Sequence, residues 1–183
     1  MQFDEQKFKE LVLYIAGKCQ GHSKYGKTKL NKILFFSDFI AYAKWGCAIT
    51  GAEYFHLPKG PAPQQMLPIM EQMVSDHELA IVPRQIFAKT QERPTNLRNA
   101  NLSEFSADEL SLVDSVIEEL REKSAEEVSS LSHYYIGWQL TQEGETIPYY
   151  SVHCRHPKAT DITKEDIEEG MRTAREFGLL DAE

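Results

Sequence analysis

The sequence predicts a mainly α-helical (α+β) fold, with five or six helices around one buried central helix and a small antiparallel β element. Three observations support this fold class. Residues 33–43 are apolar at nearly every position, interrupted only by Ser37 and Asp38, and a helix without a polar face belongs in a protein interior. Other segments repeat apolar residues at three- and four-residue spacing, as amphipathic helices do. Short β-rich runs lie between residues 49 and 90, bounded by prolines and glycines.

The composition is that of one globular domain spanning residues 1–183, with 42% hydrophobic and 26% charged residues. No apolar run reaches the roughly 18 residues of a membrane span, and the polar start is not a secretory signal. Three cysteines without a pairing pattern fit the reducing cytoplasm, where we expect this protein. The net charge of −8 argues against nucleic-acid binding by this chain alone and is compatible with a basic protein partner.

The helices in the first half follow from apolar spacing and end signals. A first amphipathic helix is expected over residues 3–19. The central helix is predicted to span Leu30–Trp45, with Thr28 as its N-cap and Gly46 in the left-handed turn that closes a helix. A third helix is expected over residues 63–78. Its buried face is formed by Met66, Ile69, Met70 and Met73.

The β-rich runs are Leu79–Val82 and Gln85–Thr90, separated by Pro83. They predict a small hairpin, or an edge strand paired with the segment around Tyr54. Residues 91–101 are polar and contain several asparagines, which predicts a long loop. This region also carries arginines of the kind that interfaces favour, namely Arg84, Arg93 and Arg98.

Two capping boxes mark helix starts in the second half. Ser106 with Glu109, and Ser124 with Glu127, place a serine three residues before a glutamate, so that each side chain can bind the other's backbone N–H. The first helix has the buried stripe Leu110, Val113, Val116, Ile117 and Leu120. The second, shorter helix is expected to end near His133, and a last helix is expected over residues 161–177.

Four segments, in this order, resemble the Panacea domain, which is also described as the SocA-like antitoxin domain. They are KLNKILFFSDF from Lys29, ITGAEYFHLPKGPAP from Ile49, the Ser132–His133 pair followed by Trp138, and EGETIPYYSV from Glu143. The resemblance covers residues 8–150. It implies an antitoxin of a bacterial or prophage toxin–antitoxin system that neutralises a cognate protein toxin by direct binding. It implies neither an enzyme nor a cofactor.

Two residues could support catalysis instead. Asp38 lies inside the apolar run. A carboxylate there is either catalytic, or it lies at the helix surface or pairs with a lysine or a backbone N–H. His133 follows Ser132, but adjacent helical residues point about 100° apart, so this pair cannot form a Ser–His hydrogen bond. We expect His133 to tether the helix end to a backbone group and Trp138 to anchor the core.

Two Cys/His clusters have spacings that a zinc site could use, Cys19-x-x-His22 and His153-Cys154-x-His156. The second cluster is short and irregular, and nothing in the sequence brings the two together, so we predict no metal. A small metal-binding protein or enzyme remains the first alternative function. The second is a phage-associated interaction adaptor without a toxin.

Basic residues are concentrated between residues 18 and 32 of this acidic chain. They are a docking patch for an acidic partner or a phosphate, or else a solvated loop and helix start. The set comprises Lys18, His22, Lys24, Lys27, Lys29 and Lys32. The sequence lacks a nucleotide-binding P-loop pattern.

The toxin interface is predicted around the rigid turn Leu57–Pro63, because side chains on a rigid support lose little entropy on binding. Aromatic side chains beside this turn and after the Ser–His pair are typical of binding hot spots. The predicted contact residues are Tyr54, His56, Lys59, Tyr134 and Tyr135. In the alternative interpretation, Tyr54 packs in the core and the turn only joins two helices.

Overall fold

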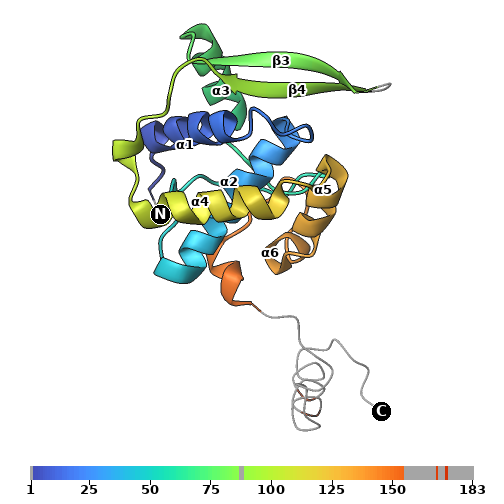
Figure 1. The fold of residues 1–183 in the computed structure, drawn as a ribbon. Helices are drawn as coiled ribbons and strands as arrows, with labels where there is room; N and C mark the ends of the chain where they lie inside the picture. The colour runs from blue at the N-terminus through green and yellow to red at the C-terminus, as the bar shows by residue number, and fades with distance from the viewer. Residues whose placement is uncertain (1, 87–88, 155–167, 169–171, 173–183) are drawn as a thin grey trace.

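The computed structural model describes residues 2–86, 89–154, 168 and 172 (Figure 1). The predicted fold class is confirmed, because helices dominate these residues and the strands form two small antiparallel pairs. The helices are α1 (Glu5–Lys18), α2 (Lys27–Trp45), α3 (Met66–Ser75), α4 (Ala107–Leu120), α5 (Ala125–His133) and α6 (Ile136–Gln139), with 3-10 turns η1 (Leu102–Glu104) and η2 (Tyr149–His153). None of the described helices combines the length and hydropathy that a bilayer crossing requires.

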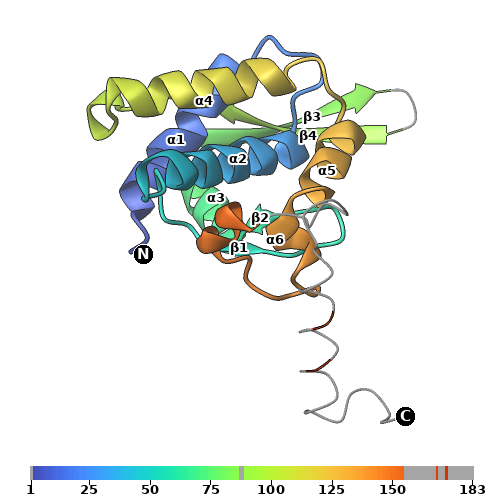
Figure 2. The ribbon, with the colours of Figure 1, turned by 90° about the horizontal axis from the view of Figure 1, so that it is seen from below.

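Helix α2 is the centre of the fold, as predicted. In Figure 2, α4 lies on one side of it, and η2 and the short strand β2 (Ala62–Pro63) lie on the other. Its apolar side chains Leu30, Leu34 and Phe35 are completely buried. The burial is not uniform around the helix, because Ile40 keeps 37% of its surface exposed.

The two ends of α2 differ in how well the sequence predicts them. Gly46 has a φ of 75° and closes the helix in the left-handed conformation, as expected. The predicted N-cap was wrong. The helix begins at Lys27 with Gly26 as its N-cap, and Thr28 lies inside the first turn.

The β structure differs from the prediction in its pairing. Strand β1 (Tyr54–Phe55) pairs with β2, so the segment around Tyr54 does not join the hairpin of β3 (Leu79–Ile86) and β4 (Lys89–Asn96). Residues 91–96 belong to β4, so the predicted loop was wrong over this range. Prolines are tolerated because each strand of a two-stranded ribbon has an open edge, where Pro83 and Pro94 are accommodated.

The other helices agree with their sequence signals, with shifts at the ends. Both capping boxes are present, and the four predicted residues of α3 are buried. Helix α3 begins only at Met66, because Pro63 is taken up in β2. In α4, Leu112 is buried while Leu110 is half-buried. The predicted helix 161–177 lies outside the described residues, except for Glu168 and Arg172.

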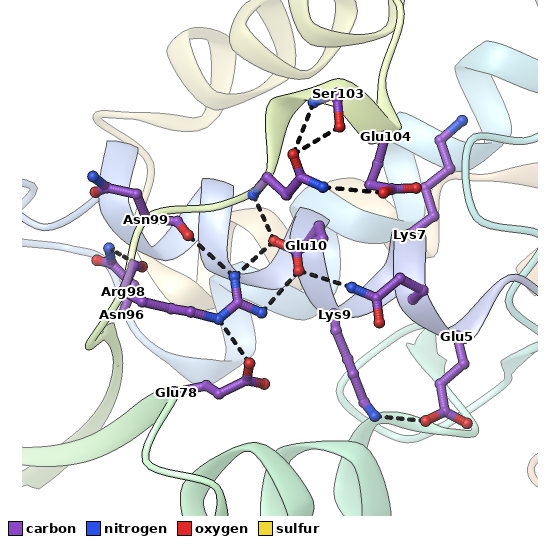
Figure 3. A network of polar contacts seen from close by, with 12 residues as sticks. Glu5, Lys7, Lys9, Glu10, Glu78, Asn96, Arg98, Asn99, Ser103 and Glu104 are labelled. Carbon is purple, nitrogen blue, oxygen red and sulfur yellow. Dashed lines mark hydrogen bonds and ion pairs between the residues drawn. The ribbon is translucent and has the colours of Figure 1, made fainter.

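Two of the arginines assigned to an interface instead hold the hairpin region, Arg98 against α1 and Arg93 against the loop that follows α1. Figure 3 shows Arg98 bound to Glu10 at 2.8 Å and to Glu78 at 2.7 Å. Burial raises the pKa of Glu10, but the hydrogen bonds from Arg98 and Asn101 lower it below its ordinary value. Arg93 donates to the carbonyls of Gln20 and His22, whereas Arg84 is exposed.

Candidate functional site

The four segments that resemble the Panacea domain converge around α2. The rigid turn of the second segment packs over Lys32 of the first, and Gly60 in that turn has a φ of 84°. A Cβ at Gly60 would lie 2.2 Å from Ser132 Oγ of the third segment and 2.9 Å from Lys32 Cε. Only glycine fits this contact, so the turn can close on α2 and α5.

The fourth segment joins the cluster through Tyr149. Its ring stacks on Phe39 of α2 at a centroid distance of 4.5 Å. Its hydroxyl donates to the carbonyl of Ala52, at 2.7 Å, in the second segment. All four segments are therefore parts of one packed unit.

Lys32 is the least expected member of this unit. Its side chain is buried, and Nζ donates to the carbonyl of Pro61 at 2.7 Å. Burial penalises the ammonium form and lowers the pKa of Lys32 to about 7. Lys32 therefore binds the Gly-Pro turn to the central helix, although burial destabilises its charged form.

Lys29 is also buried, and it caps the end of α4. Its Nζ donates to the carbonyls of Leu120 at 2.9 Å and Arg121 at 3.0 Å, where the last carbonyls of a helix lack partners. Burial lowers the pKa of Lys29.

The predicted basic patch is consequently smaller than the sequence indicated. Lys29 and Lys32 are neither solvated nor available for docking, which corrects both interpretations for these residues. Lys18 pairs with Asp114 at 2.9 Å, and Lys24 donates to the carbonyl of Glu122. Lys27 is 3.9 Å from Glu92, and burial lowers the pKa of His22.

A stack of three rings lies beside this unit. Trp138 is sandwiched between His56, at a centroid distance of 4.0 Å, and His133, at 4.1 Å, with interplanar angles of 22° and 18°. Burial lowers the pKa of His133, and Lys32 and His56 lower it further. The stack therefore links the second and third segments.

His133 was predicted to hold the end of its helix by binding a backbone group. It does contact another segment at the helix end, but the contact is a ring stack with Trp138. The Nε2 of His133 is buried and forms no hydrogen bond with the described residues, so the ring does not bind a backbone group of theirs through this atom. The ring instead holds the helix end by stacking on Trp138.

The carboxylate of Asp38 is buried in the core and bound by the segment that follows α2. The residue is completely buried, and its carboxylate accepts hydrogen bonds from Thr50 N at 2.8 Å, Thr50 Oγ1 at 2.6 Å and Tyr54 Oη at 2.8 Å. Burial raises the pKa of Asp38 despite these bonds. With no exposed surface for a substrate, Asp38 ties the segment after α2 to the helix, as the second interpretation of this residue proposed.

The structure divides the five predicted partner-binding residues. Tyr54 is completely buried, so it lies in the core and offers no surface to a partner. Tyr135 is half-buried, and its hydroxyl shares a 3.0 Å hydrogen bond with Ser151. His56 is half-buried in the ring stack, while Lys59 is exposed and Tyr134 keeps 76% of its surface exposed.

Tyr134 borders an open hollow of about 320 Å³. The residues that line it are Ser130, His133, Tyr134 and Gln139. His133 is the member of the ring stack that lines the hollow, so the hollow places one end of the stack beside the exposed Tyr134 at the end of α5.

The cysteines of the two Cys/His clusters differ in burial. Cys19 is buried, and burial raises the pKa of its thiol to about 12, which disfavours the thiolate that a metal binds. Cys154 is exposed, and His156 lies outside the described residues. Among the described residues, no group of three or more His, Cys, Asp or Glu side chains is placed to hold a metal ion.

Sequence reasoning missed the buried lysines and the ring stack. A signal for the lysines exists, since Lys29 and Lys32 flank Leu30 and Ile33 in a helix without a polar face. The stack has no such signal, because His56 and Trp138 are far apart in the sequence and meet only through the fold.

The comparison with known families identifies one family, and its match covers most of the packed unit around α2. A search of curated proteins and a search of solved structures each returned no match. The family model "Antitoxin SocA-like, Panacea domain" matches residues 30–139, which is more than half of the chain. This range includes α2, the rigid turn, and the ring stack with Trp138. The chain therefore belongs to the SocA-like, Panacea-domain antitoxin family.

Proposed function

We propose that this protein is the antitoxin of a bacterial or prophage toxin–antitoxin system, and that it neutralises its cognate protein toxin by direct binding in the cytoplasm. The observation that carries the proposal is the family match over residues 30–139. Members of an antitoxin family act on a protein partner, so a protein surface is the expected functional site.

The environments of the candidate catalytic residues support a non-enzymatic role. Asp38 and Ser132 are completely buried. Asp38 accepts a hydrogen bond from Thr50 in the segment after α2, and the Ser132 hydroxyl donates to the carbonyl of Ser129 one turn earlier in α5. Among the described residues, the exposed Tyr134, which lines the hollow beside the ring stack, is better suited to binding a partner than to catalysis.

We propose that Tyr134 and Lys59 contact the toxin, with His56 and Tyr135 supporting the surface from behind. An exposed tyrosine on a rigid helix end buries a large area at a low entropy cost, which is typical of a binding hot spot. Tyr134→Ala should therefore weaken toxin binding at least tenfold, about 1.4 kcal/mol, without changing the melting temperature.

The function is tested by co-expression with the protein encoded by the adjacent reading frame. Wild-type chain should restore growth that this protein arrests, and Tyr134→Ala should restore it less well. Tyr150→Ala is the matched control, because Tyr150 keeps 65% of its surface exposed in a different segment. Failure of the wild-type chain to restore growth would contradict the antitoxin function, and equal rescue by both variants would move the interface elsewhere.

A further inference from the structure

An apolar groove of about 280 Å³ is lined by residues of α2, α4 and α5, and both α4 and α5 pack against the central helix α2. Its floor is apolar and its edges carry a few polar side chains. The lining residues are Phe36, Ile40 and Lys44 of α2, Leu112, Ser115, Val116, Glu119 and Leu120 of α4, and Leu131 of α5.

The groove has the dimensions of a short helix-binding site. On α2 the lining residues recur at every fourth position from Phe36 to Lys44, and on α4 they span Leu112 to Leu120. Eight residues at a rise of about 1.5 Å make each wall about 12 Å long, or roughly two helical turns. Ile40 and Leu131 are 37% and 40% exposed, so apolar surface is available at both α2 and α5.

The edge formed by α4 is strongly acidic. Residues 106–127 contain eight acidic and two basic residues, a net charge of −6 in a chain of −8. Asp114 is engaged by Lys18 of α1, but Glu118, Glu119 and Glu122 lie at the far end of this segment with exposed side chains. Their ion pairs with Arg121 and Lys123 are exposed and therefore weak, so negative charge is concentrated along the α4 edge, while Lys44 lines the α2 side of the groove.

We propose that this groove binds an amphipathic helix of a partner protein, apolar on one face and basic along its flank. The inference rests on the proposed function, because that partner is the toxin. Apolar anchors spaced three or four residues apart on such a helix would fill the floor, and its basic flank would face α4. The groove lies next to the proposed toxin surface along the chain, since Leu131, which lines the groove, and Tyr134, directly after α5, are three residues apart and both exposed.

The first test uses two synthetic 18-residue peptides, one of leucine and lysine and one of leucine and glutamate, each at helical spacing. Fluorescence anisotropy with the full chain should show the lysine peptide binding at least tenfold more tightly than the glutamate peptide. Ile40→Asn and Leu131→Asn keep the charge unchanged and should each weaken the lysine peptide at least tenfold. Leu67→Asn is the matched control and should bind as wild type, because Leu67 is an exposed helical leucine, 57% exposed, outside the groove.

Several results would overturn the proposal. Absence of lysine-peptide binding by the wild-type chain would mean that the groove does not accept a helix. If all variants keep their melting temperatures and bind the lysine peptide equally well, the peptide binds through the net negative charge of the chain and not in the groove. A wild-type dimer in sedimentation that dissociates in Leu131→Asn would make the groove an interface between two copies of this chain.

A competition experiment separates this inference from the proposed function. Displacement of the lysine peptide by the purified toxin supports the groove as the toxin site. A toxin that the chain neutralises in cells but that does not displace the peptide overturns this assignment and leaves the antitoxin function standing. Absence of growth rescue contradicts the antitoxin function itself.

Discussion

At the residue scale, the fold depends on polar groups buried with specific partners. Asp38 and Lys32 both lie on the central helix, and each binds the segment that follows it, through Thr50 and Pro61. Buried polar groups cost free energy unless they are hydrogen-bonded, so these bonds select one position of the segment against the helix. The sequence left Asp38 open between catalysis, the helix surface and pairing, and it did not reveal Lys32, because lysines near a helix start are usually solvated.

The buried lysine predicts a pH dependence of stability. Folding lowers the pKa of Lys32 from 10.5 to about 7. Between these values the unfolded chain binds more protons than the folded chain, so the free energy of unfolding rises with pH. Below about pH 7 the full cost of burial is present. Between pH 8 and 9 the Lys32 contribution should rise by about 1.4 kcal/mol per pH unit.

Chemical denaturation of wild type and Lys32→Met across this pH range measures the effect. The free energy of unfolding of the wild type should rise with pH relative to that of Lys32→Met, because methionine does not titrate. Lys59→Met is the control, because Lys59 is exposed, and its curve should run parallel to wild type. Parallel curves for Lys32→Met as well would show that Lys32 is not buried in the folded protein.

At the element scale, helices with strong local signals were predictable. Capping boxes fixed the starts of α4 and α5 to the residue, because both partners of each box lie within four residues. Strand β4 was missed because its sequence, KTQERPTN, is polar and contains proline. A two-stranded ribbon with open edges accepts such residues. Arg98 binds it to α1 and Arg93 binds it to the loop after α1, and no local pattern shows these contacts.

The rigid turn predicts a difference between two glycines. Gly60 and Gly144 both have positive φ, 84° and 87°, so alanine strains the backbone at either site. At Gly60 the new Cβ also meets Ser132 and Lys32, whereas at Gly144 no atom of the described residues lies within 4 Å of it. Gly60→Ala should therefore lower the free energy of unfolding by at least about 1 kcal/mol more than Gly144→Ala. Denaturation curves of the two variants test this, and equal losses would mean that the turn does not close on α2 and α5.

At the scale of the whole molecule, the sequence predicted the family and the packing around α2, and left the surface open. Two of the five predicted interface residues, Lys59 and Tyr134, are exposed, because exposure depends on how distant segments pack. The groove was not predicted, since its walls come from helices about 75 residues apart in the chain. The acidic character of α4 was visible in the sequence, but its place beside an apolar floor was not.

The central claim is that the chain acts by binding its toxin directly. The most direct measurement is isothermal titration calorimetry of the purified full chain with the purified protein of the adjacent reading frame. We predict a saturable complex with a Kd below about 1 μM, equivalent to more than about 8 kcal/mol of binding free energy. Growth rescue in cells without a detectable complex at about 10 μM, where binding free energies weaker than roughly 7 kcal/mol escape detection, would contradict direct binding.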